Sequence, residues 1–322
     1  MTSSRELEAL QSRAIATIKP LIPADSKERV ERAVRQFNQK VREGIRAETG
    51  LRLSGEDGKG SVSIRIVDGF PTEVAKLIDR HQDQTLWRLI MAQPKLGGAI
   101  EGLGVLIEHW DEFERWLELP EVAKGSKPQL VRAAQVADAM QKLAVARKVF
   151  DEIKQIEVDI LGLYRLGDSS VDIYWMAHAL IAAMLEVRIE DLSVVTLAHE
   201  LAHAYTHVGR DIDGVAWGNE AFASSAIEVK EGLAQTYAAA VSGKLLNRAP
   251  GVVEAYEQLL KHQSEPYRVH LDWLKEQGAK RAEVVRFAML RARRMEKVDH
   301  VQWQALLKET TASLKGKKET SS

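Results

Sequence analysis

The spacing of hydrophobic residues along the chain predicts a protein built mainly from amphipathic helices. Apolar positions recur at helical intervals over residues 5–19 and 24–47, and prolines at positions 20 and 23 separate the two segments. We therefore expect a helical hairpin at the start of the chain. Other segments with the same periodicity predict further helices, at 71–78, 84–119 with a break at 93–98, 129–157, 176–186, 252–263, 267–277 and 280–297.

Three short segments alternate instead in the manner of β-strands. One covers residues 61–67 and follows a glycine-rich loop whose spacing departs from that of a phosphate-binding loop. Residues 160–165 and 171–175 flank a turn-forming group at 167–170, which predicts a β-hairpin. The expected fold class is therefore α+β and rich in helix.

Turn-forming residues divide the chain into parts. The strongest boundary is the stretch 120–128, which is rich in proline, glycine and lysine, and Pro250-Gly251 marks a second one. The lysine-rich end of the chain has the composition of a disordered segment. The expected parts are a helical N-terminal domain with a short strand near 61–67 (residues 1–125), a central unit (126–250), a C-terminal helical part packed on it (251–314) and a disordered tail (315–322).

Composition and charge narrow the classes of function. The chain has 45 Lys and Arg against 46 Asp and Glu, so no overall field attracts nucleic acid or an anionic membrane. A basic segment at 280–297 is interrupted by Glu283 and Glu296 and has no aromatic platform, which favours a solvated or partner-facing surface. No apolar run approaches the ~18 residues that span a bilayer, and no signal-peptide pattern opens the chain. We therefore expect a cytoplasmic protein with no nucleic-acid partner and no membrane span.

One stretch, His199-Glu200-Leu-Ala-His203, has the pattern of a metal site. The apolar residues around it predict a helix that ends at Gly209. Residues four apart lie one turn above each other on a helix, so both imidazoles can converge on one ion. Glu200 lies about 100° round the helix and can reach a water there without binding the metal. The chain contains no cysteine, and zinc suits the remaining donors because it accepts imidazole nitrogens and a carboxylate and leaves one position open.

A third protein ligand is expected downstream, because two histidines alone hold a catalytic zinc poorly. Glu231, in a segment with a helical pattern, is the leading candidate, and Glu228 lies one turn before it. Asp211 and Asp213 follow the predicted end of the metal helix and could be ligands or could orient a ligand imidazole. The metzincin pattern H-E-x-x-H-x-x-G-x-x-H is excluded, because its glycine and its third histidine are absent here.

Together, His199-Glu200-x-x-His203 and Glu231-Gly-Leu-Ala234 resemble the zinc metallopeptidases called gluzincins, over roughly residues 155–245. The resemblance implies a zincin-like domain with a small mixed sheet and one Zn²⁺ held by His199, His203 and Glu231. It also implies Glu200 as the general base that activates water for peptide-bond hydrolysis. The substrate would be a peptide or protein, paired as an extended strand with the edge of the sheet. By this resemblance the edge strand comprises Val171, Asp172, Ile173, Tyr174 and Trp175.

Other side chains near the motif are candidates for supporting roles. His207 continues the histidine face by a further turn and could support a ligand, stabilise an oxyanion or be a partly exposed polar residue. Some gluzincins carry an Asp four residues after the ligand Glu, whereas Gln235 stands at that position here, so support for the histidines would come from elsewhere. Tyr237 is a candidate donor to a tetrahedral intermediate, with packing as the alternative.

A second class of function also fits the motif. A non-enzymatic binding or regulatory protein could use zinc only to hold its structure. Zinc sites of that kind are usually closed by four protein ligands, so a fourth ligand such as His207 or Asp211 would favour this alternative. An open coordination position beside a groove would favour the enzyme.

Overall fold

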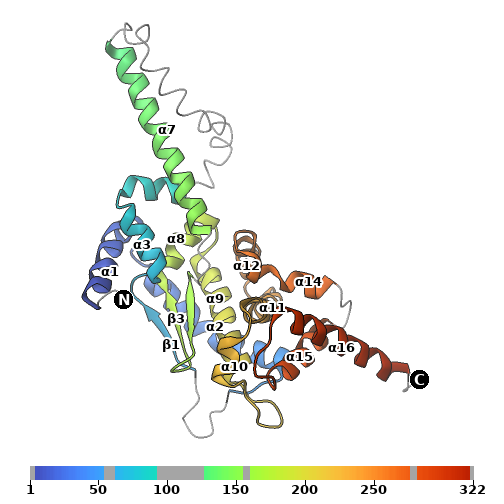
Figure 1. Cartoon of the computed structure of the whole chain (residues 1–322). Coiled ribbons are helices and arrows are strands. Elements are labelled where there is room, and N and C mark those ends of the chain that lie inside the picture. The colour runs from blue at the N-terminus through green and yellow to red at the C-terminus, as the bar shows by residue number, and fades with distance from the viewer. Residues whose placement is uncertain (1–3, 54–61, 93–126, 155–159, 276–280, 320–322) are drawn as a thin grey trace.

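The computed structural model describes residues 4–53, 62–92, 127–154, 160–275 and 281–319 of the chain (Figure 1). Most of the described residues are helical and lie beside one small three-stranded sheet, so the predicted α+β class, rich in helix, is confirmed. The helices whose bounds are described are α1 (Ser4–Ile18), the 3₁₀ turn η1 (Lys19–Leu21), α2 (Ser26–Thr49), α3 (Thr72–Arg80), α7 (Lys127–Lys154), α8 (Trp175–Leu185), α9 (Ile189–Val208), α10 (Asn219–Ser224), α11 (Ile227–Leu245), α12 (Gly251–Lys261), α13 (Glu265–Arg268), α14 (His270–Lys275), α15 (Arg281–Ala292) and α16 (His300–Glu319).

The N-terminal helical hairpin forms as the sequence predicts. Pro20 lies in η1, where it separates α1 from α2. One face of α2 is buried through Val34, Phe37 and Val41, which follow the helical period. Gly50 ends α2 in the left-handed conformation (φ 70°) and donates its backbone N–H to the carbonyl of Arg46, a cap for which glycine is the favoured residue.

The C-terminal part differs from the prediction in several places, and the helix expected at 280–297 ends already at Ala292. The single helix expected at 267–277 is instead two short ones, α13 and α14. The disordered tail is wrong over residues 315–319, because α16 continues through them, and residues 320–322 lie outside the described part. α16 packs against α15 and buries Trp303 and Leu307, which anchors the helix before its lysine-rich end. The helix predicted at 84–119 is described only as far as residue 92, and the predicted boundary at 120–128 lies almost wholly outside the described residues.

The sheet has the order β1-β3-β2, with β1 (Ile64–Val67), β2 (Gly162–Arg165) and β3 (Ser170–Tyr174). β2 and β3 form the predicted hairpin, and β1 pairs with β3 in parallel, Ile64 opposite Val171. The sheet is therefore mixed, and β3 is its central strand. The prediction that Val171–Trp175 forms the substrate edge is wrong, because β1 occupies the side of β3 that would have to be free and Trp175 already belongs to α8. The same pairing joins the predicted N-terminal and central parts through one sheet.

α9 lies at the centre of the fold (Figure 1). α2 and α11 pack along it, and α8, α12 and the sheet also contact it. Every residue of α9 except Glu190 and Val208 is buried, as expected of a helix that is surrounded by protein. Glu190 and Asp191 lie in its first turn, where negative charge is favourable, and the N–H of Gly209 donates to the carbonyl of Tyr205 at its end, as the sequence predicts.

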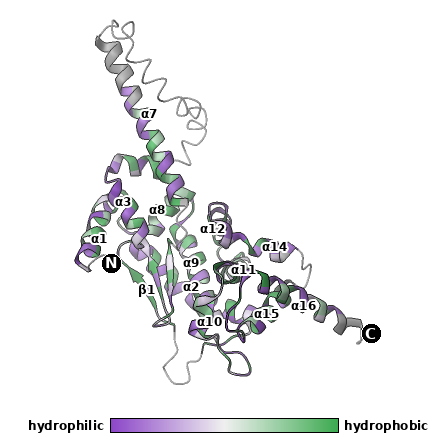
Figure 2. Ribbon diagram, in the orientation of Figure 1, coloured by the Kyte–Doolittle hydropathy of each residue, from purple (hydrophilic) through white to green (hydrophobic). Residues whose placement is uncertain are grey.

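Figure 2 shows how hydrophobic and hydrophilic residues are distributed over these helices and strands. α8 is hydrophobic along nearly its whole length, and nine of its eleven residues are buried. α7 contributes Val149, Phe150 and Ile153 to the core near its C-terminal end, while its other end extends away from the rest of the fold. Among the described helices, none combines the length and apolar character that crossing a membrane requires.

A buried carboxylate ties the three strands together. Asp172, at the middle of β3, is 2% exposed and accepts hydrogen bonds from Arg65 of β1 at 2.7 Å and Arg165 of β2 at 2.5 Å. Arg65 also contacts Asp168 and Ser170 at the hairpin turn. Both guanidinium groups are about half exposed, whereas the carboxylate is buried and depends on them for its hydrogen bonds.

We expect Asp172→Asn to lower the free energy of unfolding by about 2 kcal/mol, since a buried hydrogen bond to a charged group contributes about 1.5–3 kcal/mol. Chemical denaturation of the full chain measures this. Asp138→Asn is the control, because the Asp138–Lys142 pair lies on the exposed surface of α7 and such pairs contribute about 0–1 kcal/mol. Equal losses in the two variants would show that the sheet does not depend on Asp172.

Candidate metal centre

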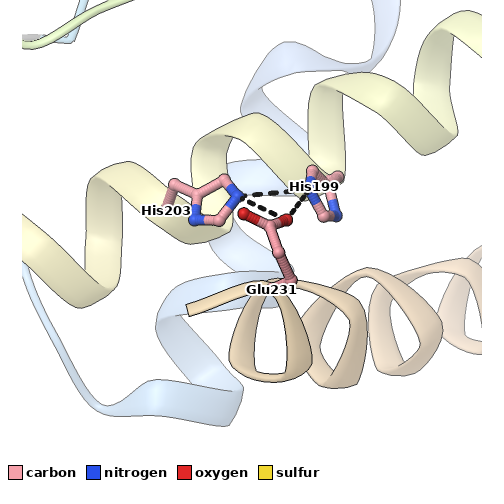
Figure 3. A group of neighbouring side chains, drawn as sticks. All are labelled: His199, His203 and Glu231. Atoms are coloured by element: carbon pink, nitrogen blue, oxygen red, sulfur yellow. Dashed lines mark hydrogen bonds and ion pairs between the residues drawn. The ribbon is translucent and has the colours of Figure 1, made fainter. Parts of the chain in front are cut away.

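Two imidazoles and one carboxylate meet between α9 and α11 (Figure 3). His199 and His203 project from successive turns of α9 towards Glu231, which lies in the second turn of α11. The Nε2 atoms of His199 and His203 lie 3.1 and 3.3 Å from the same Oε2 atom of Glu231, and 3.2 Å from each other. The structure thus brings together the three side chains that the sequence singles out as metal ligands.

The shape of this triangle fits a tetrahedral cation. Three donors that each lie about 2.0–2.1 Å from one zinc ion at tetrahedral angles are separated by about 3.3–3.4 Å. The three observed separations of 3.1, 3.2 and 3.3 Å reach that value or lie just below it. The three contacts cannot all be hydrogen bonds, because each Nε2 of a neutral imidazole is either a donor or an acceptor, and two that both donate to Glu231 face each other as N–H groups. A shared cation satisfies all three.

The environment of the three donors favours positive charge. His199, His203 and Glu231 are 6%, 4% and 7% exposed. Burial acts to lower the pKa of His203 and is the largest single influence, but the charge of Glu231 and the hydrogen bond to it together outweigh it, and the net shift is upward. Burial acts to raise the pKa of Glu231, but the charge of His203 and the hydrogen bond from His199 hold it well below its usual range. Both shifts reflect a buried negative charge that is stable only beside a positive one.

Glu200 is buried on the face of α9 that β2 covers. The close approach depends on Gly162, the first residue of β2. A Cβ atom at that position would lie 2.7 Å from both Cγ and Oε1 of Glu200 and 2.8 Å from Cγ2 of Thr196. Only glycine therefore lets the strand approach the Glu200 carboxylate without displacing it.

A cavity opens beside His199 and Glu200, both of which line it. Its volume of about 90 Å³ is several times the roughly 10–15 Å³ that one water requires. Gln235, which stands where some gluzincins carry an Asp, also lines the cavity. Its side-chain amide donates a hydrogen bond to Gln263 at 2.9 Å. Gln235 thus lies near the centre but binds Gln263, in the segment after α12, rather than His199 or His203. Nδ1 of His203 is buried and has no hydrogen-bond partner in the described part of the chain.

His207 belongs to a separate network. Its Nε2–H donates to Oδ1 of Asn219 and its Nδ1 accepts from the hydroxyl of Tyr164, each at 2.9 Å, while its ring stacks on Phe222. Burial lowers its pKa below the ordinary value for histidine, which favours the neutral form required by this pattern. Both ring nitrogens are engaged, so His207 is not a fourth ligand, and it is buried rather than partly exposed.

The remaining candidates lie away from the cluster. Asp211 accepts the backbone N–H groups of Asp213 and Val215, which organises the loop after α9, and both aspartates pair with Arg294. Tyr237 directs its hydroxyl at Sδ of Met289, 3.6 Å away, in the packed core. Within the described residues, the group able to hold an ion comprises His199, His203 and Glu231, without Glu228 or either aspartate.

Two residues near the centre were missed from the sequence. Tyr267 of α13 lines the cavity and places its ring 5.9 Å from that of His199. No local pattern links it to a motif 64 or more positions earlier. Gly162 did carry a signal, because a glycine inside a strand-forming run often marks a close approach of the backbone to another group.

Comparisons of the chain with models of known protein families, with curated proteins and with solved structures find no match.

We expect the full chain to bind one zinc ion. Glu231→Ala should weaken that binding by at least about 100-fold, because loss of a group that only orients a metal ligand already lowers metal affinity by about 10–100-fold. Competition with a chromophoric chelator, together with metal analysis, measures the affinity and the stoichiometry. Glu228→Ala is the matched control and should retain the wild-type affinity. If the two variants behave alike, Glu231 is not a ligand.

Proposed function

We propose that the protein is a zinc-dependent hydrolase that cleaves peptide bonds. The observation that carries the proposal is that His199, one of the three converging donors, lines the same cavity as Glu200. The resemblance of His199-Glu200-x-x-His203 and Glu231-Gly-Leu-Ala234 to gluzincin motifs supports the same conclusion.

The donors suit zinc better than the other common divalent cations. Two imidazole nitrogens and one carboxylate oxygen match the three-ligand sets of catalytic zinc, whereas magnesium and calcium favour oxygen donors. His199, His203 and Glu231 would hold the ion and leave one position free. When bound, zinc supplies a Lewis acid that lowers the pKa of water towards neutrality and polarises a carbonyl oxygen.

Glu200 is the proposed general base. Its carboxylate takes a proton from the attacking water and delivers it to the leaving nitrogen of the peptide bond. β2 holds the carboxylate in place through the contact at Gly162, and the cavity beside it provides room for a group of the substrate.

The substrate edge is proposed to be β2 instead of β3. β2 is an outer strand of the sheet and carries Gly162 against Glu200. The N–H of Tyr174 donates to the carbonyl of Leu161, so alternation along an antiparallel pair directs the backbone groups of Leu163 towards β3. The backbone groups of Gly162 and Tyr164 then face away from β3, where an extended peptide could pair with them.

The alternative of a purely structural zinc is less well supported. A structural site would be closed by a fourth protein ligand. His207 and Asp211, the two candidates for that role, are held by Tyr164, Asn219 and Arg294 instead. The donor group within the described chain thus has three members and adjoins a cavity.

Glu200→Gln should retain one zinc ion per chain and cleave about 10²–10⁴ times more slowly than the wild type, because it cannot accept the proton. Mass spectrometry of a mixture of unstructured peptides measures cleavage, and metal analysis of the same samples measures zinc. Cleavage at the wild-type rate would assign the base to another residue. A zinc-loaded wild type that cleaves none of the peptides would favour the structural alternative.

Gly162→Ala should retain the fold and the zinc but slow cleavage by about 100-fold, since its methyl group displaces the Glu200 carboxylate and misplacement by about 1 Å can cost that much. Gly167→Ala, in the turn that follows β2, is the control, because a Cβ there meets nothing within 4 Å. Thermal unfolding of both variants checks the fold. Normal turnover by Gly162→Ala would show that the position of Glu200 does not depend on β2.

A further inference from the structure

The cavity beside Glu200 is lined by residues of six helices and of β2, and most of these residues are apolar. α7 and α8 form one side, α9 carries Glu200 and the ligand His199, and α12 closes the other side. Because Glu200 and His199 themselves line the cavity, a group bound in it lies next to the atoms that would react. The apolar walls are made by Phe150, Ile153, Ile181, Leu185, Val195 and Leu259.

Apart from Thr196, His199 and Glu200 of α9, the polar side chains that line the cavity are Gln235 of α11 and those of residues 262–264 after α12. Gln263 lies there, in hydrogen-bond contact with Gln235, and the ring of His262 meets that of Phe150 edge to face, with centroids 6.1 Å apart. None of the described residues that line the cavity is Lys or Arg. An acidic side chain or a terminal carboxylate placed in the cavity would therefore lose its hydration without gaining a lysine or arginine partner, and it would lie beside the negative charge of Glu200.

A basic side chain fits the cavity poorly for a different reason. The carboxylate that a basic group would meet there is Glu200, and an ion pair with it would remove the proposed base from its task. Large uncharged apolar side chains gain from burial against the walls at no such cost. The volume of about 90 Å³ accommodates more than a few waters, so the cavity is of the size that a side chain can use.

We infer that this cavity selects peptides that carry a large uncharged apolar side chain, such as Leu, Met or Phe, at a residue flanking the scissile bond. The inference rests on the proposed function and adds the substrate class. It also implies that a peptide's terminal carboxylate is not recognised in this cavity. A hydrophobic pocket commonly discriminates by about 10–200-fold for each change of one methylene or its equivalent, so the preference should be easily measured.

The test uses the zinc-loaded full chain and matched peptides that differ only at the residues on either side of the cleaved bond. We expect kcat/KM for Leu or Phe at the selected position to exceed that for Ala by at least about tenfold, and those for Asp and Lys by more. Comparable rates for all five residues, or a preference for Asp or Lys, would overturn the inference while leaving the proposed hydrolase intact.

A variant of the cavity wall sharpens the test. Leu259 lines the cavity from α12 and is only half-buried, so Leu259→Phe should fold and should fill part of the space. It is expected to lower the ratio of kcat/KM for Phe over Ala by at least about tenfold. Leu246→Phe is the control, because Leu246 is half exposed and lies outside the cavity lining, and it should leave the ratio unchanged. An unchanged ratio in Leu259→Phe would show that the cavity does not bind the side chain beside the scissile bond.

A binding measurement separates failure of the inference from failure of the proposed function. Fluorescein-labelled peptides of the same series are titrated with Glu200→Gln protein and followed by anisotropy, which requires no turnover. Tighter binding of the Leu and Phe peptides than of the Asp peptide supports the inference even if no peptide is cleaved. If the wild type neither binds zinc nor cleaves, the proposed function fails. If all peptides bind Glu200→Gln alike, the inference fails.

Discussion

The contact of a buried carboxylate with two buried imidazoles is the constraint on which the arrangement of this protein depends. Charges removed from water cost several kcal/mol each unless they are paired. α9 and α11 must therefore hold Glu231 against His199 and His203, and the helices around them must exclude water from the contact. The nearly complete burial of α9 follows from this requirement, since the charged groups lie on a helix that is packed on every side.

The sheet also helps to position Glu200, because its strand β2 lies against that side chain. Gly162 lets β2 lie against the Glu200 carboxylate, and Asp172 joins β2 to β1 and β3 through two arginines. The position of the strand relative to α9 is thus determined by one glycine and one buried ion cluster. A larger residue in place of Gly162, or a neutral one in place of Asp172, would therefore change the distance between β2 and α9.

Local patterns in the sequence predicted the parts of the fold that depend on neighbouring residues. The helical hairpin before Gly50, the β2–β3 hairpin and the spacing of His199 and His203 are all set by periodicity and turn residues within short segments. The resemblance supplied Glu231. The pairing of β1 with β3 and the approach of Tyr267 to His199 could not be predicted, because they join segments distant in sequence and no local pattern records which surface will meet which.

The parallel pairing of β1 with β3 has a consequence for how the chain folds. The paired residues Arg65 and Asp172 are 107 positions apart in the sequence. The central strand β3 therefore gains β1 as its second neighbour only after these two distant segments have met. Contacts of such separation slow folding far more than they change stability. Until these segments meet, one side of β3 presents unpaired backbone groups that can bind a strand from another molecule. Completion of the sheet and protection against aggregation therefore depend on the same encounter between two distant segments of the chain.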